Sequence, residues 1–416
     1  MQIDNQATAP SAPTSAPQWV EHANERTILL IILALNSVFL TTAMMVMPLG
    51  PDISDALQMN PAYVGYLNAA VTLAAAVSGI VFAPFLDKFD RRPLLVISTI
   101  VKSVFIVAAG LSQSWLELIV WLVLSAIFAG PATSALMASV IDIVPPQRRG
   151  RAMALVGSAF SISAIVGIPV ILQLAHMFSW QQVFIIIGVL PIVMSLLVWR
   201  VLPSLTAHKN QSKPPFSALF KRPEIIAAFV LVACHMLGHF MLVPNIATHL
   251  VFNLDYPRDW LGVLYFAGGI TSLLALKFSG KWMDQRSPVA LIVALSVVII
   301  VAIVLLFVET SVVPVIFAFM LFMAATSART SSTMAYVSRF PKPFERAGFM
   351  SLQNTVTQLA AGVASVFAAQ WLSAGGELAD TAVVVDLSGM SSLALFAIVF
   401  MCLHPVVFIW LVRKAG

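Results

Sequence analysis

The sequence predicts an all-α integral membrane protein, because its composition is strongly apolar and its apolar runs are long enough to span a bilayer. Of the 416 residues, 60% are hydrophobic and only 10% are charged, and the mean hydropathy is +0.94. Soluble domains carry about 25% charged residues. The apolar runs are about 20 residues long, which suffices for a helix to cross the hydrocarbon core. We therefore expect twelve transmembrane helices.

Polar loops separate the twelve predicted spans. The spans are 27–49, 61–85, 93–112, 116–140, 152–175, 182–201, 223–249, 260–280, 288–308, 312–337, 348–371 and 392–412. Residues 1–26 contain the run ATAPSAPTSAP, which is poor in apolar residues, and they are predicted to form a disordered cytoplasmic tail. The first apolar run follows this tail at full length, so no cleavable signal peptide is expected.

The distribution of basic residues predicts the orientation. If the N-terminus is cytoplasmic, nearly all Lys and Arg residues fall in cytoplasmic loops, and the opposite loops hold only Arg258. Both termini are then cytoplasmic. The net charge of +5 reflects this topology rather than nucleic-acid binding, which needs a concentrated basic patch. Cys234 and Cys402 both lie in predicted spans, so neither a disulfide nor a cysteine metal site is indicated.

The second half of the chain repeats the first at a constant offset. The polar stretch 202–222 is predicted to be a cytoplasmic linker between a six-helix bundle at 27–201 and a second one at 223–416. Matching residues separated by 197 positions are Gly65 and Gly262, Leu67 and Leu264, Asp87 and Asp284, Pro146 and Pro343, Arg149 and Arg346, and Met153 and Met350. They occupy corresponding loops and helix starts, which indicates a duplicated unit.

Two six-helix halves around a central linker resemble the major facilitator superfamily, and the loop after the second span resembles its signature, Gly-x-Leu-Ala-Asp-Arg-x-Gly-Arg-Arg. The matching residues in APFLDKFDRRPLL are Asp87, Lys88, Arg91 and Arg92, and the weaker copy GKWMDQR keeps Gly280 and Asp284. Ala83 and Asp90 replace the two glycines of the signature. The resemblance implies a gate in which Asp87 caps the start of the eleventh helix near Gly348. The alternative is a loop that only sets orientation.

The fifth span resembles the Gly-x-Pro antiporter motif of the bacterial drug and sugar (arabinose-type) efflux permeases. Its stretch ALVGSAFSISAIVGIPVILQLA contains Gly157, Gly167 and Pro169. A small residue lets helices approach closely, and proline leaves a carbonyl unpaired and kinks the helix. The alternative is that glycine and proline are simply common in membrane helices.

One buried cation is predicted in an unusual place. Ala126 and Ala129 stand where many proton-coupled drug exporters carry Arg and Gln, so the fourth span lacks that cation. Arg329 in the tenth span is the replacement candidate, because a charge at that depth costs on the order of 3 kcal/mol unless water or a partner compensates it. The alternative is that Arg329 snorkels to the cytoplasmic surface. Lys102 in the third span is expected to be peripheral.

Three histidines are the remaining titratable candidates inside predicted spans, because no Asp or Glu falls in the middle of a span: His235, His239 and His404. The resemblance implies that the twelfth helix, which carries His404, lies outside the cavity. His235 and His239 lie four apart in ACHMLGH and therefore share a helix face. A zinc site is disfavoured because zinc needs three or four ligands. A structural role in hydrogen bonds between helices and a cavity role in proton coupling or substrate contact both stay open. Asn36, Asn245 and Arg329 are candidates for the same water-filled space.

Together these features predict a secondary active transporter of the bacterial inner membrane. It is expected to export small organic molecules, such as drugs, sugars or metabolites, by alternating access with proton antiport. The alternative is an importer, or a dedicated metallophore or lipid transporter, of the same fold. No Gly-rich phosphate loop or nucleophile elbow indicates an enzyme. The expected partners are the substrate, protons and membrane lipids around a monomer, with no cofactor, metal or nucleic acid.

Overall fold

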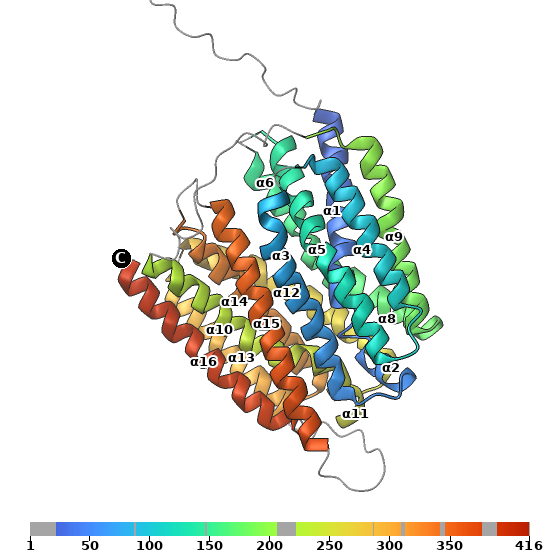
Figure 1. Ribbon diagram of the computed structural model, residues 1–416. Coiled ribbons are helices and arrows are strands. Elements are labelled where there is room, and N and C mark those ends of the chain that lie inside the picture. The colour runs from blue at the N-terminus through green and yellow to red at the C-terminus, as the bar shows by residue number, and fades with distance from the viewer. Residues whose placement is uncertain are drawn as a thin grey trace, which may run out of the picture.

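The structure is a computed structural model that describes residues 22–86, 89–145, 148–205, 222–285, 287–308, 313–341, 346–376 and 389–415. Within these ranges every regular element is a helix (Figure 1). The first half comprises α1 (His22–Met44), α2 (Gly50–Ala56), η1 (Pro61–Tyr63), α3 (Val64–Leu86), α4 (Arg91–Ala109), α5 (Trp115–Ile143), α6 (Arg149–Gly157), α7 (Ala159–Ile162), η2 (Ser163–Gly167), α8 (Ile168–Met177) and α9 (Trp180–Val201).

The second half has the same helical character. It comprises α10 (Pro223–Leu242), η5 (Val243–Asn245), α11 (Ile246–Asn253), η6 (Arg258–Trp260), α12 (Leu261–Gln285), α13 (Pro288–Ile303), η7 (Val304–Val308), α14 (Val315–Val337), α15 (Arg346–Gly376) and α16 (Met390–Ala415). In the part of the chain that the structure describes, eleven helical stretches are long and apolar enough to cross a membrane. They correspond to eleven of the twelve predicted spans, and the all-α membrane class is confirmed.

The predicted span 348–371 is the exception. It lies in α15, which has 31 residues and is long enough, but its composition is more polar than that of the other eleven helices. The reason is its position between the two halves, where it packs along α3 (Figure 1). There the Asn68 amide donates a hydrogen bond of 2.8 Å to Ser365 Oγ. A helix that faces protein rather than lipid can carry such polar residues because they find partners.

The first, fifth and seventh predicted spans are interrupted in the structure. The first ends at Met44, and the separate short helix α2 follows after a turn. The fifth is divided into α6, α7, the π-helical turn η2 and α8, which agrees with the bend predicted before Pro169. The seventh changes to a single 3-10 turn at η5, because Pro244 has no backbone N–H to continue the α-helix.

The contacts between the two halves repeat the sequence offset. Helix α3 packs on α15, and α12 packs on α8 and η2. A Cβ atom built on Gly65 would lie 3.0 Å from Ala369 Cβ, and one built on Gly262 would lie 4.0 Å from Leu172 Cβ. Gly262 and Leu172 are each displaced by 197 positions from Gly65 and Ala369. The two interfaces are therefore related copies of one contact.

A second pair of contacts shows the same relation. A Cβ atom on Gly362 would lie 3.0 Å from Thr72 Oγ1, and a Cβ atom on Gly269 would lie 3.2 Å from Ile165 Cα. Gly269 and Ile165 again lie 197 positions from Thr72 and Gly362. Both glycines stand where two helices of different halves approach closely. The duplication inferred from the sequence is thus supported by tertiary contacts that the repeat itself did not specify.

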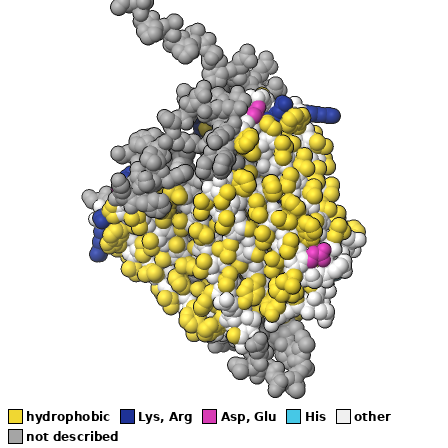
Figure 2. All heavy atoms as spheres, in the orientation of Figure 1, with side chains coloured by type: hydrophobic (Ala, Val, Ile, Leu, Met, Phe, Trp, Pro, Cys, Tyr) yellow, Lys and Arg dark blue, Asp and Glu magenta, His cyan; other side chains and the backbone are white. Residues whose placement is uncertain are grey.

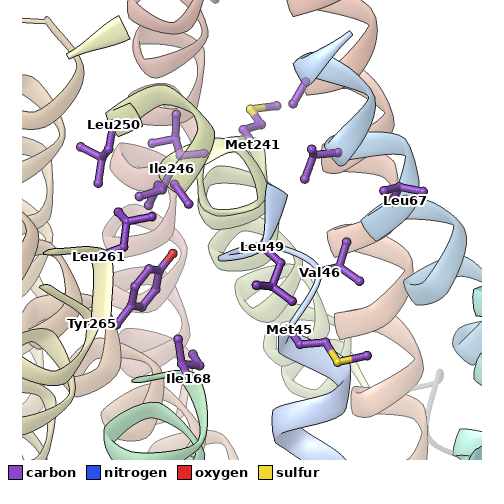
Figure 3. Packing of buried hydrophobic residues seen from close by; sticks show 14 of the residues in the cluster. Met45, Val46, Leu49, Leu67, Ile168, Met241, Ile246, Leu250, Leu261 and Tyr265 are labelled. Carbon is purple, nitrogen blue, oxygen red and sulfur yellow. The ribbon is translucent and has the colours of Figure 1, made fainter. Parts of the chain in front are cut away.

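A single apolar cluster joins the two halves at one end. Figure 3 shows it as the meeting of α1, the turn after it, α3 and α8 with α10, α11 and α12. Its labelled members are Met45, Val46, Leu49, Leu67, Ile168, Met241, Ile246, Leu250, Leu261 and Tyr265. Two other large clusters, around Val140 and Phe408, each stay within one half. We call the joined cluster the outer seal, because the predicted topology places it at the outer end.

The surface matches a lipid environment. Figure 2 shows hydrophobic side chains over most of the described part of one face, with charged side chains toward its ends. Many large apolar side chains on the outside of the helices are exposed, among them Val399, Phe278 and Leu274. Such a surface would be an aggregation liability in water and is expected in contact with hydrocarbon.

Candidate functional site

A buried guanidinium stands at the centre of a polar cluster in the second half. Arg329 on α14 is 0% exposed and is directed toward α10, α13 and α16. Its Nη1 donates to Ser296 Oγ at 3.3 Å and to the Met401 carbonyl at 3.5 Å. Its Nη2 lies 2.8 Å from His235 Nδ1 and 2.6 Å from the Met401 sulfur. The snorkelling alternative for Arg329 is therefore wrong.

The acceptors around Arg329 carry no formal charge. Within the described residues, its hydrogen-bond partners are an imidazole, a hydroxyl, a thioether and a carbonyl, and no carboxylate pairs with it. A buried cation is ordinarily compensated by a carboxylate, because desolvating an unpaired charge costs several kcal/mol. Arg329 is thus held by dipoles alone, in an arrangement that depends strongly on each acceptor.

The hydrogen bonds of His235 define its tautomer. Thr330 Oγ1 donates to the Thr326 carbonyl at 2.8 Å, so this hydroxyl accepts from His235 Nε2–H at 2.6 Å. Nδ1 then has a free lone pair, which accepts from Arg329. His235 is therefore a neutral imidazole with its proton on Nε2. Both ring nitrogens are engaged, which leaves none for a metal ion.

Two further imidazoles surround His235. His239, one helical turn along α10, is half-buried and stacks on His235 with ring centroids 5.7 Å apart. Its other face stacks on Phe322 at 5.8 Å. His404 on α16 is fully buried, lies edge-on to His235 at 5.8 Å, and bonds to the Thr333 hydroxyl at 3.2 Å. The sequence prediction brought His235, His239 and Arg329 together correctly.

His404 was a candidate in the sequence that was set aside, because the family resemblance implies that its helix lies outside the cavity, but the structure brings it against His235. The signal available in the sequence was a histidine in an apolar span directly before Pro405. Lys102 was predicted to be peripheral, and this is wrong: it is 6% exposed, with its ammonium 4.2 Å from the centre of the Phe39 ring. Its aliphatic stem and the aromatic face make that burial possible.

The two candidate asparagines lie apart from the cluster. Asn36 on α1 donates to the Val156 carbonyl of α6 at 3.1 Å, so it joins two helices of the first half. Asn245 lies at the η5 break beyond α10 and is fully buried. Among the described residues, neither of its side-chain polar atoms has a hydrogen-bond partner. In the described structure neither asparagine hydrogen-bonds to Arg329, and the water-filled space that they were expected to share with it stays a prediction.

The signature loop is described only in part. Asp87 and Lys88 lie outside the described residues, and the predicted cap on the eleventh helix stays a prediction. Arg91 Nε lies 3.6 Å from the Asp142 carboxylate at the end of α5. Arg92 Nη1 donates to the Leu202 carbonyl at 3.3 Å, and its guanidinium lies over the Trp199 ring. Both arginines therefore fasten the loop to the first half.

In the weaker copy of this loop, Gly280 and Asp284 both fall in α12. A Cβ atom built on Gly280 would meet no atom within 4 Å among the described residues, so its position places no packing constraint on the side chain. The side chain of Asp284 lies outside the described part of the chain. Its predicted part in the gate stays a prediction.

Asp90, which replaces a signature glycine, has a definite role. Its carboxylate caps α4 by accepting from the Arg92 amide at 3.0 Å, and it also accepts from the Leu205 amide at 3.0 Å and from the Ser204 hydroxyl. Partial burial opposes ionisation, but these bonds, with the nearby Arg92 charge, outweigh it and hold the pKa of Asp90 below its usual range. The departure from the family signature thus ties the loop to the chain after α9.

The antiporter-like motif surrounds the bend in the fifth span. Gly167 ends η2 directly against the Thr41 side chain, so a larger residue has no room there. The Thr41 and Ser163 hydroxyls lie 3.0 Å apart, and each is within hydrogen-bond distance of the Ser37 carbonyl, which accepts from them. Gly157 has nothing within 4 Å of its Cβ position in the described structure, and Pro169 begins α8. Of the two glycines, only Gly167 permits a close helix approach.

Comparisons with known proteins agree with this architecture. The sequence profile of the Major Facilitator Superfamily matches residues 29–365. A "Probable sugar efflux transporter" of Helicobacter pylori (strain G27) is 24% identical over 258 residues, which cover 60% of this chain and 64% of the relative. One of Helicobacter acinonychis (strain Sheeba) is 25% identical with the same coverage. The chain therefore spans 64% of the length of these curated relatives.

Solved structures share the fold along nearly the whole chain. A bacterial homolog to the human lysosomal transporter Spinster, inward-facing and unoccupied, has a TM-score of 0.78 at 15% identity and covers 95% of this chain and 98% of its own. The inward-facing and occupied form has a TM-score of 0.76 at 15% identity, with coverage of 93% and 97%. At this identity the likeness concerns the fold alone.

Proposed function

Because the chain belongs to the major facilitator superfamily, we propose that it exports small organic molecules across the bacterial inner membrane by alternating access, in exchange for protons. Its two halves rock against each other around a site between them, with both termini in the cytoplasm. The observation that carries this proposal is the outer seal, which joins the halves at one end while the other large apolar clusters stay within one half.

Two ion pairs support a closed outer end. Arg258 of η6 donates to both carboxylate oxygens of Asp52 in α2, at 2.8 and 2.6 Å. His176 at the end of α8 lies 2.9 Å from Asp259. Each pair links the first half to the second. Since these contacts must break when the outer end opens, they favour an inward-facing state, the state in which the similar solved structures are described.

The substrate class and the direction rest on the relatives. The relatives from Helicobacter pylori and Helicobacter acinonychis are named probable sugar efflux transporters, which favours export of sugars or similarly small organic molecules. The polar cluster around Arg329 supports proton antiport, because an imidazole is a group that can take up and release a proton. Asp and Glu residues, the more usual proton carriers, are confined in the sequence to tails, loops and span ends.

Transport in vesicles of known orientation tests this function. Purified protein would be placed in inverted vesicles with an acidic interior, and labelled sugars and cationic dyes would be supplied outside. An exporter driven by proton antiport accumulates its substrate inside, and a protonophore abolishes the accumulation. Vesicles without the protein are the control. Accumulation only in right-side-out vesicles would instead establish the importer alternative.

A further inference from the structure

Building on the proposed proton antiport, we propose that a proton and Arg329 compete for one atom, Nδ1 of His235. While this nitrogen is unprotonated, it holds the guanidinium inside the second half. When it takes up a proton, Arg329 is released, and of the two hydrogen bonds that join α14 to His235 on α10 only the one with Thr330 is kept. His235 is thereby the coupling residue, and Arg329 is the part of the structure that moves in response.

The competition follows because Nδ1 of His235 has a single lone pair and can therefore hold either a hydrogen bond from Arg329 or a proton. Nη2 of Arg329 is only a donor, and at 2.8 Å from Nδ1 it uses the single lone pair of that nitrogen. A proton added to His235 must occupy the same lone pair, because Nε2 already donates to Thr330. The imidazolium would then direct an N–H and a positive charge at a guanidinium. The two cannot share this position.

The other acceptors of Arg329 are too weak to retain it alone. Ser296 Oγ at 3.3 Å and the Met401 carbonyl at 3.5 Å are at the long end of hydrogen-bond distances, and the Met401 sulfur is a weak acceptor. Ser296 can accept because its own hydroxyl donates to the Ile292 carbonyl. Protonation therefore removes the strongest partner of a fully buried cation that no described carboxylate compensates.

Among the titratable groups of the cluster, only His235 bonds to Arg329, which makes it the coupling site. The titratable or charged groups that face it in the described structure are His239 on its own helix, Arg329 on α14 and His404 on α16. Helix α13 contributes only the Ser296 hydroxyl. His239 and His404 contact His235 through their rings and do not bond to Arg329. A proton on either of them would leave the Nη2–Nδ1 bond intact.

Proton uptake proceeds without any further reactant. A proton from the aqueous phase forms the Nδ1–H bond of His235, the hydrogen bond from Arg329 breaks, and the guanidinium keeps its own charge. The cluster then carries one additional positive charge. Return of Arg329 to Nδ1 requires that this proton leave, and the proposed antiport supplies the proton at one membrane face and removes it at the other.

Spin labels at the cytoplasmic ends test this competition in the full chain. Arg151 of α6 and Lys281 of α12 are exposed and belong to different halves, and labels on R151C/K281C would be measured in a C234S/C402S background. In nanodiscs between pH 5.5 and 8, the distance distribution should redistribute between two populations. One coupled proton changes the equilibrium constant by up to about tenfold per pH unit.

The decisive variant is His235→Asn, whose side-chain oxygen can accept from Arg329 and does not titrate. It should abolish the pH response and keep the high-pH distribution throughout. His239→Asn is the matched control on the same helix face and should keep the response. If His235→Asn does not fold, Arg329→Gln should also abolish the response, because the competing donor is shortened and uncharged.

The outcomes separate this inference from the proposed function. A pH response unchanged in both His235→Asn and Arg329→Gln, or lost only in His239→Asn, overturns the competition. Proton-driven export without a His235-dependent pH response overturns it too, while export stands. A His235-dependent response in a protein that imports its substrate supports the competition and rejects export.

Discussion

The two halves are alike where they touch each other and unlike inside. At their interface, the contact of Gly362 with Thr72 recurs as that of Gly269 with Ile165, displaced by 197 positions. Inside the second half, Arg329 and His235 form a buried polar cluster. The residues 197 positions earlier are Ala132 and Val38, which cannot form one. The contacts between the halves are therefore repeated in both copies of the unit, whereas the buried cluster of Arg329 and His235 occurs only in the second half.

The interior of the first half has a different polar content. Its helices α1 and η2 are joined by the hydroxyls of Thr41 and Ser163, which bond to the Ser37 carbonyl. Its buried cation, Lys102, lies over the Phe39 ring. Neither arrangement includes an imidazole. The comparison locates the π-helical break of the fifth span in the first half and the imidazoles around Arg329 in the second half.

Among the proposed variants, a buried arginine placed in the first half should have the largest effect on folding. Ala132→Arg would place a cation in the fully buried Ala132 position of the first half, without the acceptors that Arg329 has. The cost is on the order of 3 kcal/mol or more, so the folded yield in membranes should fall by about tenfold or more. Fluorescence-detected size-exclusion chromatography measures this yield.

The controls for that transplant separate charge from volume. Ala132→Met adds a long side chain without charge, and its folded yield should fall less than that of Ala132→Arg. The double variant V38H/A132R supplies an imidazole at the position equivalent to His235 and should recover part of the yield. Equal yields for the Arg and Met variants would show that the first half accommodates the charge, and the comparison would fail.

Removing the cation from the second half should have the next largest effect. Arg329→Ala leaves His235 Nδ1 without its donor, and transport in vesicles should fall by about tenfold or more. Arg329→Lys keeps the charge without the planar fork and should retain part of the activity. Wild-type transport rates in both variants, at equal expression, would assign Arg329 a purely structural role.

The interface glycines test how closely the two copies of the contact agree. Gly269→Ala would place Cβ 3.2 Å from Ile165 Cα and 3.3 Å from the Ala164 carbonyl carbon, which are backbone atoms. Gly362→Ala would meet only side chains, those of Leu73 and Thr72, which can rotate. We expect a loss of about 1–3 kcal/mol for Gly269→Ala and less for Gly362→Ala.

Thermal unfolding in detergent measures this difference between the interface glycines. Gly157→Ala is the matched control, because its Cβ position has nothing within 4 Å in the described structure and alanine favours the helix. If Gly362→Ala destabilised the protein as much as Gly269→Ala, the two contacts would be equally tight and this distinction between the copies would be lost.

The smallest effect on stability is expected at Asp90. This residue caps α4 and bonds to the chain after α9. Asp90→Ala removes the cap of α4 and should cost about 1 kcal/mol. Because the folded pKa of Asp90 is lowered, its contribution is present above the unfolded pKa of about 3.9 and is lost as pH falls through the folded pKa. Thermal melts from pH 3 to 7 should show wild type and variant converging toward the acid end. A constant difference would contradict this.

The sequence by itself determined the membrane class, eleven of the spans, the repeat and the bend in the fifth span. Each depends on local properties: about 20 apolar residues in a row, a proline without an N–H, or an offset between similar stretches. It also placed His235 and His239 on one helix face, since the helical period alone requires that.

Only the tertiary structure decided what these side chains meet. The period of α14 does not say whether Arg329 turns to lipid, to the space between the halves or into its own half. Its bond to His235 joins residues 94 positions apart, and His404 joins the cluster from a third helix. Asp90 ties the loop to the chain beyond α9 because Leu205 and Ser204 return to it there. Hydrogen bonds between distant segments depend on how the helices pack, and packing sums many weak contacts that no single stretch of sequence contains.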